Sequence, residues 1–339
     1  MSRDRQTKQA APVTMRDIAK EAGVSVATVS HVVNNKAGAR IGEETRQRVH
    51  DAIDHLGYRT NALAKTLSVG SSRFIGLVAD AIATTPFAGQ IIHGAQDEAW
   101  KHGYVLLVAN TEGNQAAEND AIAMMLEHQV KGILYSTWYH REIDVPESLH
   151  QTDTVLVDCF STGSGLPAVV PDEEQGGNTA TAELIAAGHQ RIAFINTTTP
   201  SPALTGRLAG YRSALEAAGI DYDESLVIPA IPEQEGGYEA TASIIDSGAT
   251  AVFCHNDRVA MGLYDGLRDR GLDIPKDIAV VGFDNQEVIA AHLRPPLTTV
   301  ALPHYELGAA GIRVLLGLDP EQDDEMYLID CPAIRRQSV

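Results

Sequence analysis

From Arg73 onward, short apolar runs alternate with amphipathic segments. The expected strands are FIGLVA (74–79), YVLLVA (104–109), GILY (132–135), TVLVD (154–158), RIAFI (191–195), AVFC (251–254) and IAVVGFD (278–284). Segments between them, such as GQIIHGAQDEAWKHG, carry apolar residues at helical spacing. This alternation predicts repeated βα units and a parallel sheet. This alternating pattern continues for about 260 residues, which is more than a single sheet and its helices usually contain. We therefore expect an α/β body of two doubly wound lobes.

The first 72 residues have a different, helical pattern. The segments MRDIAKEAG, VATVSHVVNN and EETRQRVHDAIDHLGY are separated by Gly23-Val24-Ser25 and by residues 36–42. We therefore expect four parts: a disordered tail (1–12), an all-helical head (13–59), a short helix and linker (60–72) and the α/β body (73–339).

Two capping patterns define the first two helices of the head. Thr14, with Asp17 three residues later, resembles a capping box, and Gly23 permits the left-handed turn that ends the first helix. Ser25 can cap the second helix through its hydroxyl. Val29, Val32 and Val33 then fall on the buried side, and Val26, Ala27, Ser30 and His31 point outward. The pattern predicts a helix-turn-helix, or alternatively a plain αα-hairpin packed on the body.

Charge is distributed unevenly between the two regions. The formal net charge is −19, which by itself argues against a nucleic-acid partner. Residues 1–72, however, contain 11 Lys and Arg against 7 Asp and Glu, whereas the remainder contains 15 against 38. A basic head on an acidic body favours the helix-turn-helix and suggests a nucleic-acid contact confined to the head.

Cysteine spacing and hydropathy exclude several classes of protein. Cys159, Cys254 and Cys331 lie far apart, so neither a zinc knuckle nor a disulfide framework is indicated, and a reducing cytoplasm fits. No apolar stretch approaches the roughly 18 residues of a membrane span, and the N-terminus has no apolar signal region. We expect a cytoplasmic protein with no metal, cofactor or membrane partner.

One family shares these features over nearly the whole chain. VTMRDIAKEAGVSVATVSHVVNN followed by ETRQRVHDAIDHLGYRTNALAKTL resembles the DNA-binding head and hinge of the lactose/galactose repressor family. TPFAGQIIHGA, GHQRIAFI, GRLAGYRSAL, FCHNDRVAMG, IPKDIAVVGFDN and PPLTTV follow in the family's order. The resemblance implies a sequence-specific transcription regulator, a repressor, that binds near-palindromic double-stranded operator DNA as a homodimer.

The resemblance also assigns DNA-binding positions to the head and hinge. They are Thr14, Ser25, Val26, Ala27, Thr28, Ser30, His31, Asn34, Asn61 and Leu67. His31 could donate to guanine, whereas Val26 and Ala27 offer only apolar contact, for example to a thymine methyl. The stretch 61–67 matches the hinge helix, which is too short to be stable without DNA. Leu67 matches the leucine that the family wedges into the minor groove.

The body resembles periplasmic sugar-binding proteins, whose ligand lies between two lobes. The implied lobes are about 73–170 with 297–323, and about 171–296 with 324–339. Asp158, Arg207, Asn256 and Asp284 match the family's effector contacts. The other expected effector residues are Asp80, Phe87, which could cover the ligand, and Trp138 and Phe160, which could stack on it. For the aspartates at 158 and 284 the alternative is loop or helix capping, for Arg207 a structural ion pair, and for Trp138, Tyr139 and Phe160 a place in the core or rim.

A mono- or disaccharide is the effector that the resemblance favours. Cys159 departs from the aromatic residue of purine-responsive relatives, which argues against a nucleobase. The expected mechanism couples ligand binding, through movement of the lobes, to pairing of the two hinge helices.

Two alternative functions remain: a sugar kinase or oxidoreductase with a fused DNA-binding head, and a transport-type sugar-binding protein. The chain has no phosphate-binding or dinucleotide-binding glycine motif and no H-E-x-x-H. It also has no heptad tail, so a dimer is expected rather than a tetramer.

Overall fold

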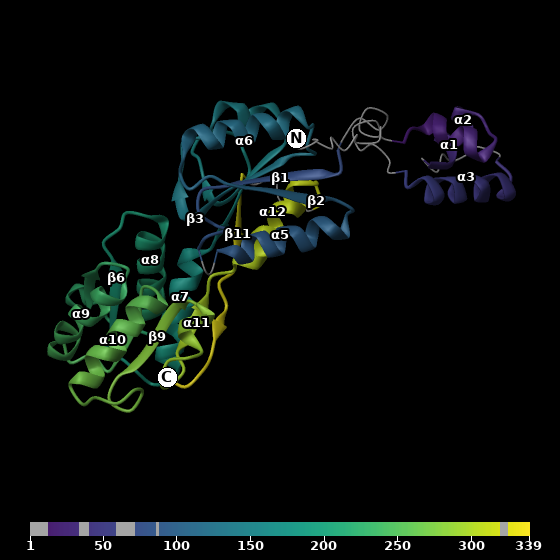
Figure 1. The fold of residues 1–339 in the computed structure, drawn as a ribbon. Coiled ribbons are helices and arrows are strands. Elements are labelled where there is room, and N and C mark those ends of the chain that lie inside the picture. The colour runs from purple at the N-terminus through teal and green to yellow at the C-terminus, as the bar shows by residue number, and fades with distance from the viewer. Residues whose placement is uncertain (1–12, 34–40, 59–71, 86–87, 319–324) are drawn as a thin grey trace, which may run out of the picture. The chain divides into compact units, whose positions relative to one another are not determined.

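The computed structural model describes residues 13–33, 41–58, 72–85, 88–318 and 325–339. The chain divides into two compact units, residues 1–72 and residues 73–339 (Figure 1).

The described residues of the first unit, 13–33, 41–58 and 72, form three helices: α1 (Met15–Ala22), α2 (Val26–Val33) and α3 (Glu43–Leu56). Each contributes apolar residues at helical spacing to one small core, which contains Ile18, Ala19, Ala22, Val29, Val32, Val49 and Ala52. This arrangement is the predicted helical head.

The expected caps are present at the turn between α1 and α2. The backbone N–H and the hydroxyl of Thr14 both donate to Oδ2 of Asp17, at 2.8 and 2.7 Å. Gly23 has φ of +65°, the left-handed conformation that ends α1. Oγ of Ser25 accepts from the N–H of Thr28 at 3.1 Å and so caps α2. These three predictions are confirmed.

The second unit consists of two lobes, each built on a six-stranded, mainly parallel sheet (Figure 1). The N-terminal lobe has the strand order β11-β5-β4-β3-β1-β2. Its elements are β1 (Phe74–Ala79), α5 (Gly89–Lys101), β2 (Val105–Asn110), α6 (Gln115–Glu127), β3 (Ile133–Glu142), η1 (Glu147–Gln151), β4 (Thr154–Phe160), β5 (Ala168–Pro171), α12 (His304–Leu315) and β11 (Met326–Ile329).

The C-terminal lobe has the strand order β12-β10-β9-β8-β6-β7. Its elements are α7 (Glu173–Ala186), β6 (Ile192–Thr197), α8 (Pro202–Ala217), η2 (Glu224–Leu226), β7 (Val227–Ala230), α9 (Gln234–Asp246), β8 (Ala251–Cys254), α10 (Asp257–Asp269), β9 (Ala279–Asp284), α11 (Glu287–Ala290), β10 (Thr298–Ala301) and β12 (Ala333–Ile334). The predicted α/β body of two doubly wound lobes is confirmed.

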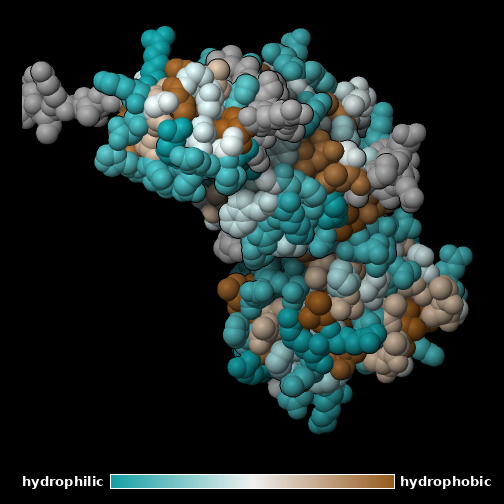
Figure 2. Space-filling model, turned by 90° about the vertical axis from the view of Figure 1, so that its right-hand side faces the viewer, coloured by the Kyte–Doolittle hydropathy of each residue, from teal (hydrophilic) through white to brown (hydrophobic). Residues whose placement is uncertain are grey.

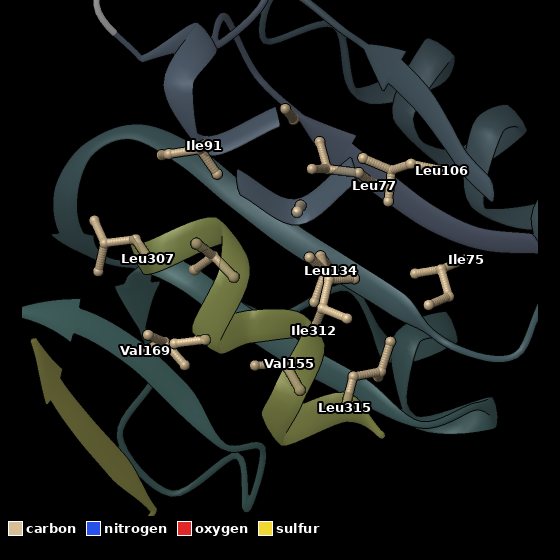
Figure 3. Close-up of a cluster of buried hydrophobic side chains, with 14 of the residues drawn as sticks. Ile75, Leu77, Ile91, Leu106, Leu134, Val155, Val169, Leu307, Ile312 and Leu315 are labelled. Carbon is tan, nitrogen blue, oxygen red and sulfur yellow. The ribbon is translucent and has the colours of Figure 1, made fainter. Parts of the chain in front are cut away.

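Helices cover both faces of each sheet. In the N-terminal lobe α5 and α12 pack on one face, where Ile312 of α12 lies beside Leu134 and Val155 of the sheet (Figure 3). In the C-terminal lobe α9 and α10 cover one face and α7 and α8 the other. On the face of the molecule in Figure 2, hydrophobic residues form separate patches among hydrophilic ones. Parallel strands that are covered on both faces explain the continuous apolar runs in the sequence.

The chain crosses between the lobes three times, after β5, after β10 and between β11 and β12. This differs from the expected lobe boundaries near residues 297 and 324. Strand β10 (298–301) pairs with β9 in the C-terminal lobe, and β11 (326–329) pairs with β5 in the N-terminal lobe. The resemblance located the crossings only approximately, and strand pairing places them at about residues 302 and 330.

Candidate functional site

The exposed face of α2 is the candidate surface for base contacts in the head. Val26 and Ala27 are exposed, and the Val26 residue is 42% accessible. Ser30 and His31 are half-buried on the same helix, and Val29 and Val32 face the core. The first two turns therefore present two small apolar side chains, a hydroxyl and an imidazole.

Two further predicted positions take part in the cap. The hydroxyls of Ser25 and Thr28 lie 2.9 Å apart at the start of α2. Thr14 lies at the start of α1 and is exposed. Helix starts of this kind offer N–H groups and hydroxyls to phosphates. Asn34, Asn61 and Leu67, predicted for the DNA interface, lie outside the described residues, as does Phe87.

A cleft of about 240 Å³ lies between the two lobes of the body. Its lining consists of Trp138, Tyr139, His140, Glu173, Thr197, Thr199, Ser201, Ala203, Arg207, Pro232, Glu233, His255, Asn256, Arg258, Asp284 and Leu302. Many of these residues lie at or just beyond the carboxyl ends of β3, β6, β8 and β9, where doubly wound sheets bind their ligands. Four predicted effector residues line it: Trp138, Arg207, Asn256 and Asp284.

A bulge in β3 supplies the N-terminal lobe's share of the lining. Ser136 pairs with Val157 of β4, but the next pair is Arg141 with Cys159. Strand β3 therefore has three more residues between the two pairs than β4 has. Trp138, Tyr139 and His140 lie in this excess segment, and all three line the cleft. Bulges of this kind turn side chains out of a sheet, often beside binding sites.

Arg207 of α8 and Glu173 of α7 form a buried ion pair at the cleft. Nε of Arg207 donates to Oε2 of Glu173 at 2.7 Å, with side-chain exposures of 4% and 5%. The guanidinium also donates to the carbonyl of His255 and covers the ring of Phe283, 3.6 Å from its centroid. Burial alone would raise the pKa of Glu173, but Arg207 and His140 outweigh it and lower the pKa to about 2. Arg207 thus makes the structural ion pair that was the alternative, and it lines the cleft as well.

Glycines bring α7 and α8 close enough for this pair to form. A Cβ on Gly206 would lie 2.6 Å from Cβ of Glu173. A Cβ on Gly177 would collide with the backbone of Arg207, and one on Gly210 with the carbonyl of Glu174. The GRLAGY and EEQGG segments therefore act together in setting the distance between the arginine and the glutamate.

Two aspartates near the carboxyl ends of corresponding central strands of the two lobes have unusual backbone conformations. Asp158, in β4, has φ of +58°, and Asp284, at the end of β9, has φ of +96°. Such conformations are costly for residues other than glycine and cluster at functional sites. Oδ2 of Asp284 accepts from Nε2 of Gln286 at 2.9 Å, and Oδ1 lies 3.9 Å from Nη1 of Arg207. Burial raises the pKa of Asp284, although Arg207 partly opposes the rise.

Asp158 is fully buried, and neither of its carboxylate oxygens has a hydrogen-bond partner among the described residues. Burial, and then the nearby carboxylates of Glu173 and Asp284, raise the pKa of Asp158 well above its usual value. Asp158 does not line the cleft. Its place behind the lining suits a protonated carboxyl better than a direct contact with ligand.

The other predicted residues have structural partners. The amide of Asn256 accepts from the N–H of Val259 as the N-cap of α10 and donates to the carbonyl of Pro232. Asp80 accepts from the N–H of Trp138 at 3.0 Å and from Arg141 at 3.0 Å, so it holds the bulge in place. Phe160 packs edge-on against His140, with ring centroids 5.7 Å apart. Asp80 and Phe160 support the lining but are not part of it.

Sequence reasoning missed several residues of the lining, among them His140, Glu173, His255 and Arg258. A signal existed for Glu173, because PDEE follows the apolar stretch AVV that forms β5. That strand of four residues was not expected. His140 could not be found from strand periodicity, because the bulge interrupts the strand.

No group of three His, Cys, Asp or Glu within the described ranges could hold a metal ion. In the same residues, no helix is long and apolar enough to cross a membrane.

Two family models match the chain. The model of bacterial regulatory proteins of the lacI family matches residues 14–61, which include α1, α2 and α3. The model of the periplasmic binding protein-like domain matches residues 181–339.

Whole-chain comparisons agree with both matches. The HTH-type transcriptional repressor PurR of Vibrio atlanticus is 33% identical over 94% of this chain and 95% of its own length. The structure of the lac repressor dimer bound to operator and the anti-inducer ONPF superposes with a TM-score of 0.77 at 26% identity, covering 97% of this chain and 99% of that one. The transcriptional regulator CelR in complex with cellobiose has a TM-score of 0.63 at 28% identity, over 96% and 100% of the two chains. These relatives are regulators rather than enzymes, and the chain belongs to the lacI family of bacterial regulatory proteins.

Proposed function

We propose that this protein is a transcriptional repressor that binds near-palindromic operator DNA as a homodimer and is controlled by a sugar bound between its lobes. The observation that carries the proposal is the cleft, in which aromatic rings from the N-terminal lobe face polar groups from the C-terminal lobe beside a buried arginine. The DNA-binding head is the part that the family model matches, and the cleft is the proposed effector-binding site.

In the head, α2 enters the major groove. His31 donates to a guanine, and Val26 and Ala27 contact a thymine methyl or exclude other groups sterically. Thr14, Ser25 and Thr28 lie at helix starts and bind phosphates, which fixes the register of the helix on the duplex. Ser30, Asn34, Asn61 and Leu67 complete the interface, with Leu67 in the minor groove.

In the cleft, hydroxyl groups of the sugar hydrogen-bond to polar groups on the C-terminal lobe. Asp284 accepts, Arg207 donates from the part of its guanidinium that Glu173 leaves open, and Thr199, Ser201 and Asn256 line the same space. Trp138 supplies an apolar face for the ring. The cavity volume lies just below the range of about 300–1,000 Å³ typical of larger ligands, which suits a small sugar.

The position of the cleft suggests how the ligand acts. Trp138, Tyr139 and His140 belong to one lobe, and most of the other lining residues belong to the other. A ligand that contacts both sides stabilises one relative position of the lobes over another, and only that difference in affinity can shift the equilibrium. Three crossing segments permit such a hinge motion. Lobe movement within the dimer then alters pairing of the hinge helices.

Exposed apolar side chains on the N-terminal lobe support a dimer. Strand β2 is the edge of its sheet and exposes Val105 and Val108. Trp100, at the end of the preceding helix, is 61% exposed. An edge strand with exposed apolar residues is a typical protein interface. We therefore place part of the subunit contact at β2 and the end of α5.

Fluorescence anisotropy with the palindromic DNA upstream of this gene tests the proposal. At fixed salt, full-length protein should bind at nanomolar concentration with two chains per duplex, and a scrambled duplex should bind far more weakly. Ribose, glucose, galactose, lactose and cellobiose are then added separately. A tenfold or larger change in operator affinity with one sugar is the expected result. Weak binding that is indifferent to DNA sequence would reject the DNA-binding part, and no response to any sugar would reject the effector class.

A further inference from the structure

Both arginines that line the cleft face a glutamate. Arg207 lies 2.7 Å from Glu173, and Nε of Arg258 lies 3.5 Å from Oε2 of Glu233. Asp284 adds a third carboxyl group to the lining. The cleft therefore carries no surplus of positive charge, although it contains two of the side chains that proteins most often use to bind anions.

Little of the Arg207 guanidinium remains for an incoming anion. Nε is taken by Glu173, Nη1 by the carbonyl of His255, and one face by the ring of Phe283. Asp284 lies on the Nη1 side at 3.9 Å. A phosphate or carboxylate approaching the open part would meet two carboxyl groups at close range, in a site where burial strengthens every electrostatic interaction.

Glu173 keeps its negative charge over the whole physiological pH range, since Arg207 and His140 lower its pKa to about 2. Its second oxygen, Oε1, lies 3.5 Å from Nδ1 of His140 across the cleft, too far for a good hydrogen bond. The Arg207 contact is much shorter, so the carboxylate is committed to the arginine and acts as a built-in anion beside it.

We propose that Glu173 is a specificity-determining residue that excludes anionic ligands from the cleft. Sugar phosphates and sugar acids are rejected, and uncharged polyhydroxylated ligands are admitted. Glu173 takes the place beside Arg207 that the anionic group of such a ligand would otherwise occupy. The preference for uncharged sugars rests on the proposed function, whereas the exclusion of anions can be tested without it.

The test uses inorganic phosphate as the probe and full-length protein with the substitution Glu173→Gln. Glutamine keeps the shape of the side chain but removes its charge, so Arg207 loses its nearest counter-ion and retains the more distant carboxyl of Asp284, 3.9 Å from Nη1. Isothermal titration should show no binding of phosphate to the wild type at millimolar concentration. Phosphate should bind E173Q with a dissociation constant at least roughly tenfold below the highest phosphate concentration used for the wild type. Phosphate should also raise the melting temperature of E173Q but not that of the wild type.

Two control variants separate charge at the site from charge elsewhere. Glu174→Gln removes the same charge from the next residue, which is exposed, and should behave as the wild type does. Glu173→Asp retains the carboxylate and should still exclude phosphate. If E173Q is too unstable to titrate, Glu173→Asn provides the neutral variant. The fraction of protein that refolds is then measured with and without phosphate, and phosphate should increase it only for the neutral variant.

Phosphate binding to the wild type as tight as to E173Q would overturn the proposal. Failure of the neutral variants to gain any phosphate binding would overturn it too, because another feature would then exclude anions. Glucose and glucose 6-phosphate are titrated in parallel, and the wild type should bind only the uncharged member if either binds. Should none of the uncharged sugars bind, the proposed effector class fails, while the phosphate titration still decides the role of Glu173.

Discussion

The pKa values of two buried acids near the cleft, Glu173 and Asp158, are shifted in opposite directions. Both are almost inaccessible to water, and burial on its own raises the pKa of each. Glu173 lies 2.7 Å from a guanidinium, and its pKa falls to about 2. Asp158 has no hydrogen-bond partner within the described parts of the chain and has other carboxylates nearby, so its pKa rises. The nearest partner, rather than the depth of burial, decides which acid is charged.

Replacement of Asp158 by Asn should stabilise the protein at neutral pH. The folded state holds a proton on Asp158 at pH values where the unfolded chain, with a pKa near 3.8, has released it. Wild-type stability therefore carries a penalty that grows as pH rises above about 4, and the neutral amide removes it. Each kcal/mol gained raises the melting temperature of a domain this size by about 2–4 °C.

Melting temperatures of D158N and the wild type between pH 4 and pH 8 check this. The gain should be present at pH 7 and shrink toward pH 4. The exposed residue Asp120 provides the control, because D120N should give a difference that varies little with pH. An Asn variant that is less stable than the wild type at pH 7 would show that Asp158 is charged and stabilising in the folded protein.

His31 is the only side chain among the exposed and half-buried residues of the first two turns of α2 that can donate two hydrogen bonds when protonated. His31→Ala should weaken operator binding by about 1–3 kcal/mol, or roughly 5–150-fold, and relax the preference for one base pair. Anisotropy titrations against the operator and its single-base variants measure both effects. His128→Ala, at an exposed position of the body, is the matched control. A uniform loss across all operator variants would instead assign His31 to a phosphate.

The sequence predicted some residues of the cleft and missed others, and the difference has a physical reason. Arg207, Asn256 and Asp284 follow directly from the family resemblance, and all three line the cavity. The partner of Arg207 did not follow, because Glu173 lies 34 residues away and reaches it only through the packing of α7 on α8. Asp80 and Phe160 were expected to touch the ligand, but their contacts support Trp138 and His140 instead.

At the scale of elements, the contact between α7 and α8 deserves a direct test through its glycines. A Cβ on Gly210 would collide with the carbonyl of Glu174 and approach the backbone of Gly177. The G210A variant must therefore push the helices apart, at a cost of about 1–3 kcal/mol. Separation of the helices also loosens the ion pair between Arg207 and Glu173.

Chemical denaturation should show this loss in G210A, and sugar binding should weaken with it. Gly89, at the start of α5, provides the control because a Cβ there meets no atom within 4 Å. G89A should leave stability within about 0.5 kcal/mol of the wild type. Equal stability of G210A and the wild type would mean that the helices adjust without cost and do not fix the geometry of the pair.

The strands also differ in how well the apolar pattern of the sequence predicts them. The seven expected strands are present as β1, β2, β3, β4, β6, β8 and β9, and all of them except β8 have six residues or more. The unexpected strands β5, β7, β10, β11 and β12 have four residues or fewer. In β7 the sequence VIPA is only partly buried and contains a proline, which is tolerated at the edge of a sheet. Strands this short are defined by their neighbours more than by their own residues.

At the scale of the whole molecule, charge and family membership agree. The residues beyond position 72 carry 38 acidic against 15 basic side chains, so this region repels DNA, whereas the first 72 residues carry a basic surplus. DNA contact is thereby directed to the head. The proposed contacts with the ligand and with the second subunit belong to the body.

The most direct test of the account is reciprocity between the two sites. The sugar that most changes operator affinity is titrated by calorimetry into the free protein and into the protein saturated with operator, at one salt concentration. We predict that operator changes the protein's affinity for the sugar by the same factor by which the sugar changes its affinity for operator, roughly 5–150-fold. Identical sugar affinity in the two titrations would contradict it, because the cleft and the head would then bind their ligands independently.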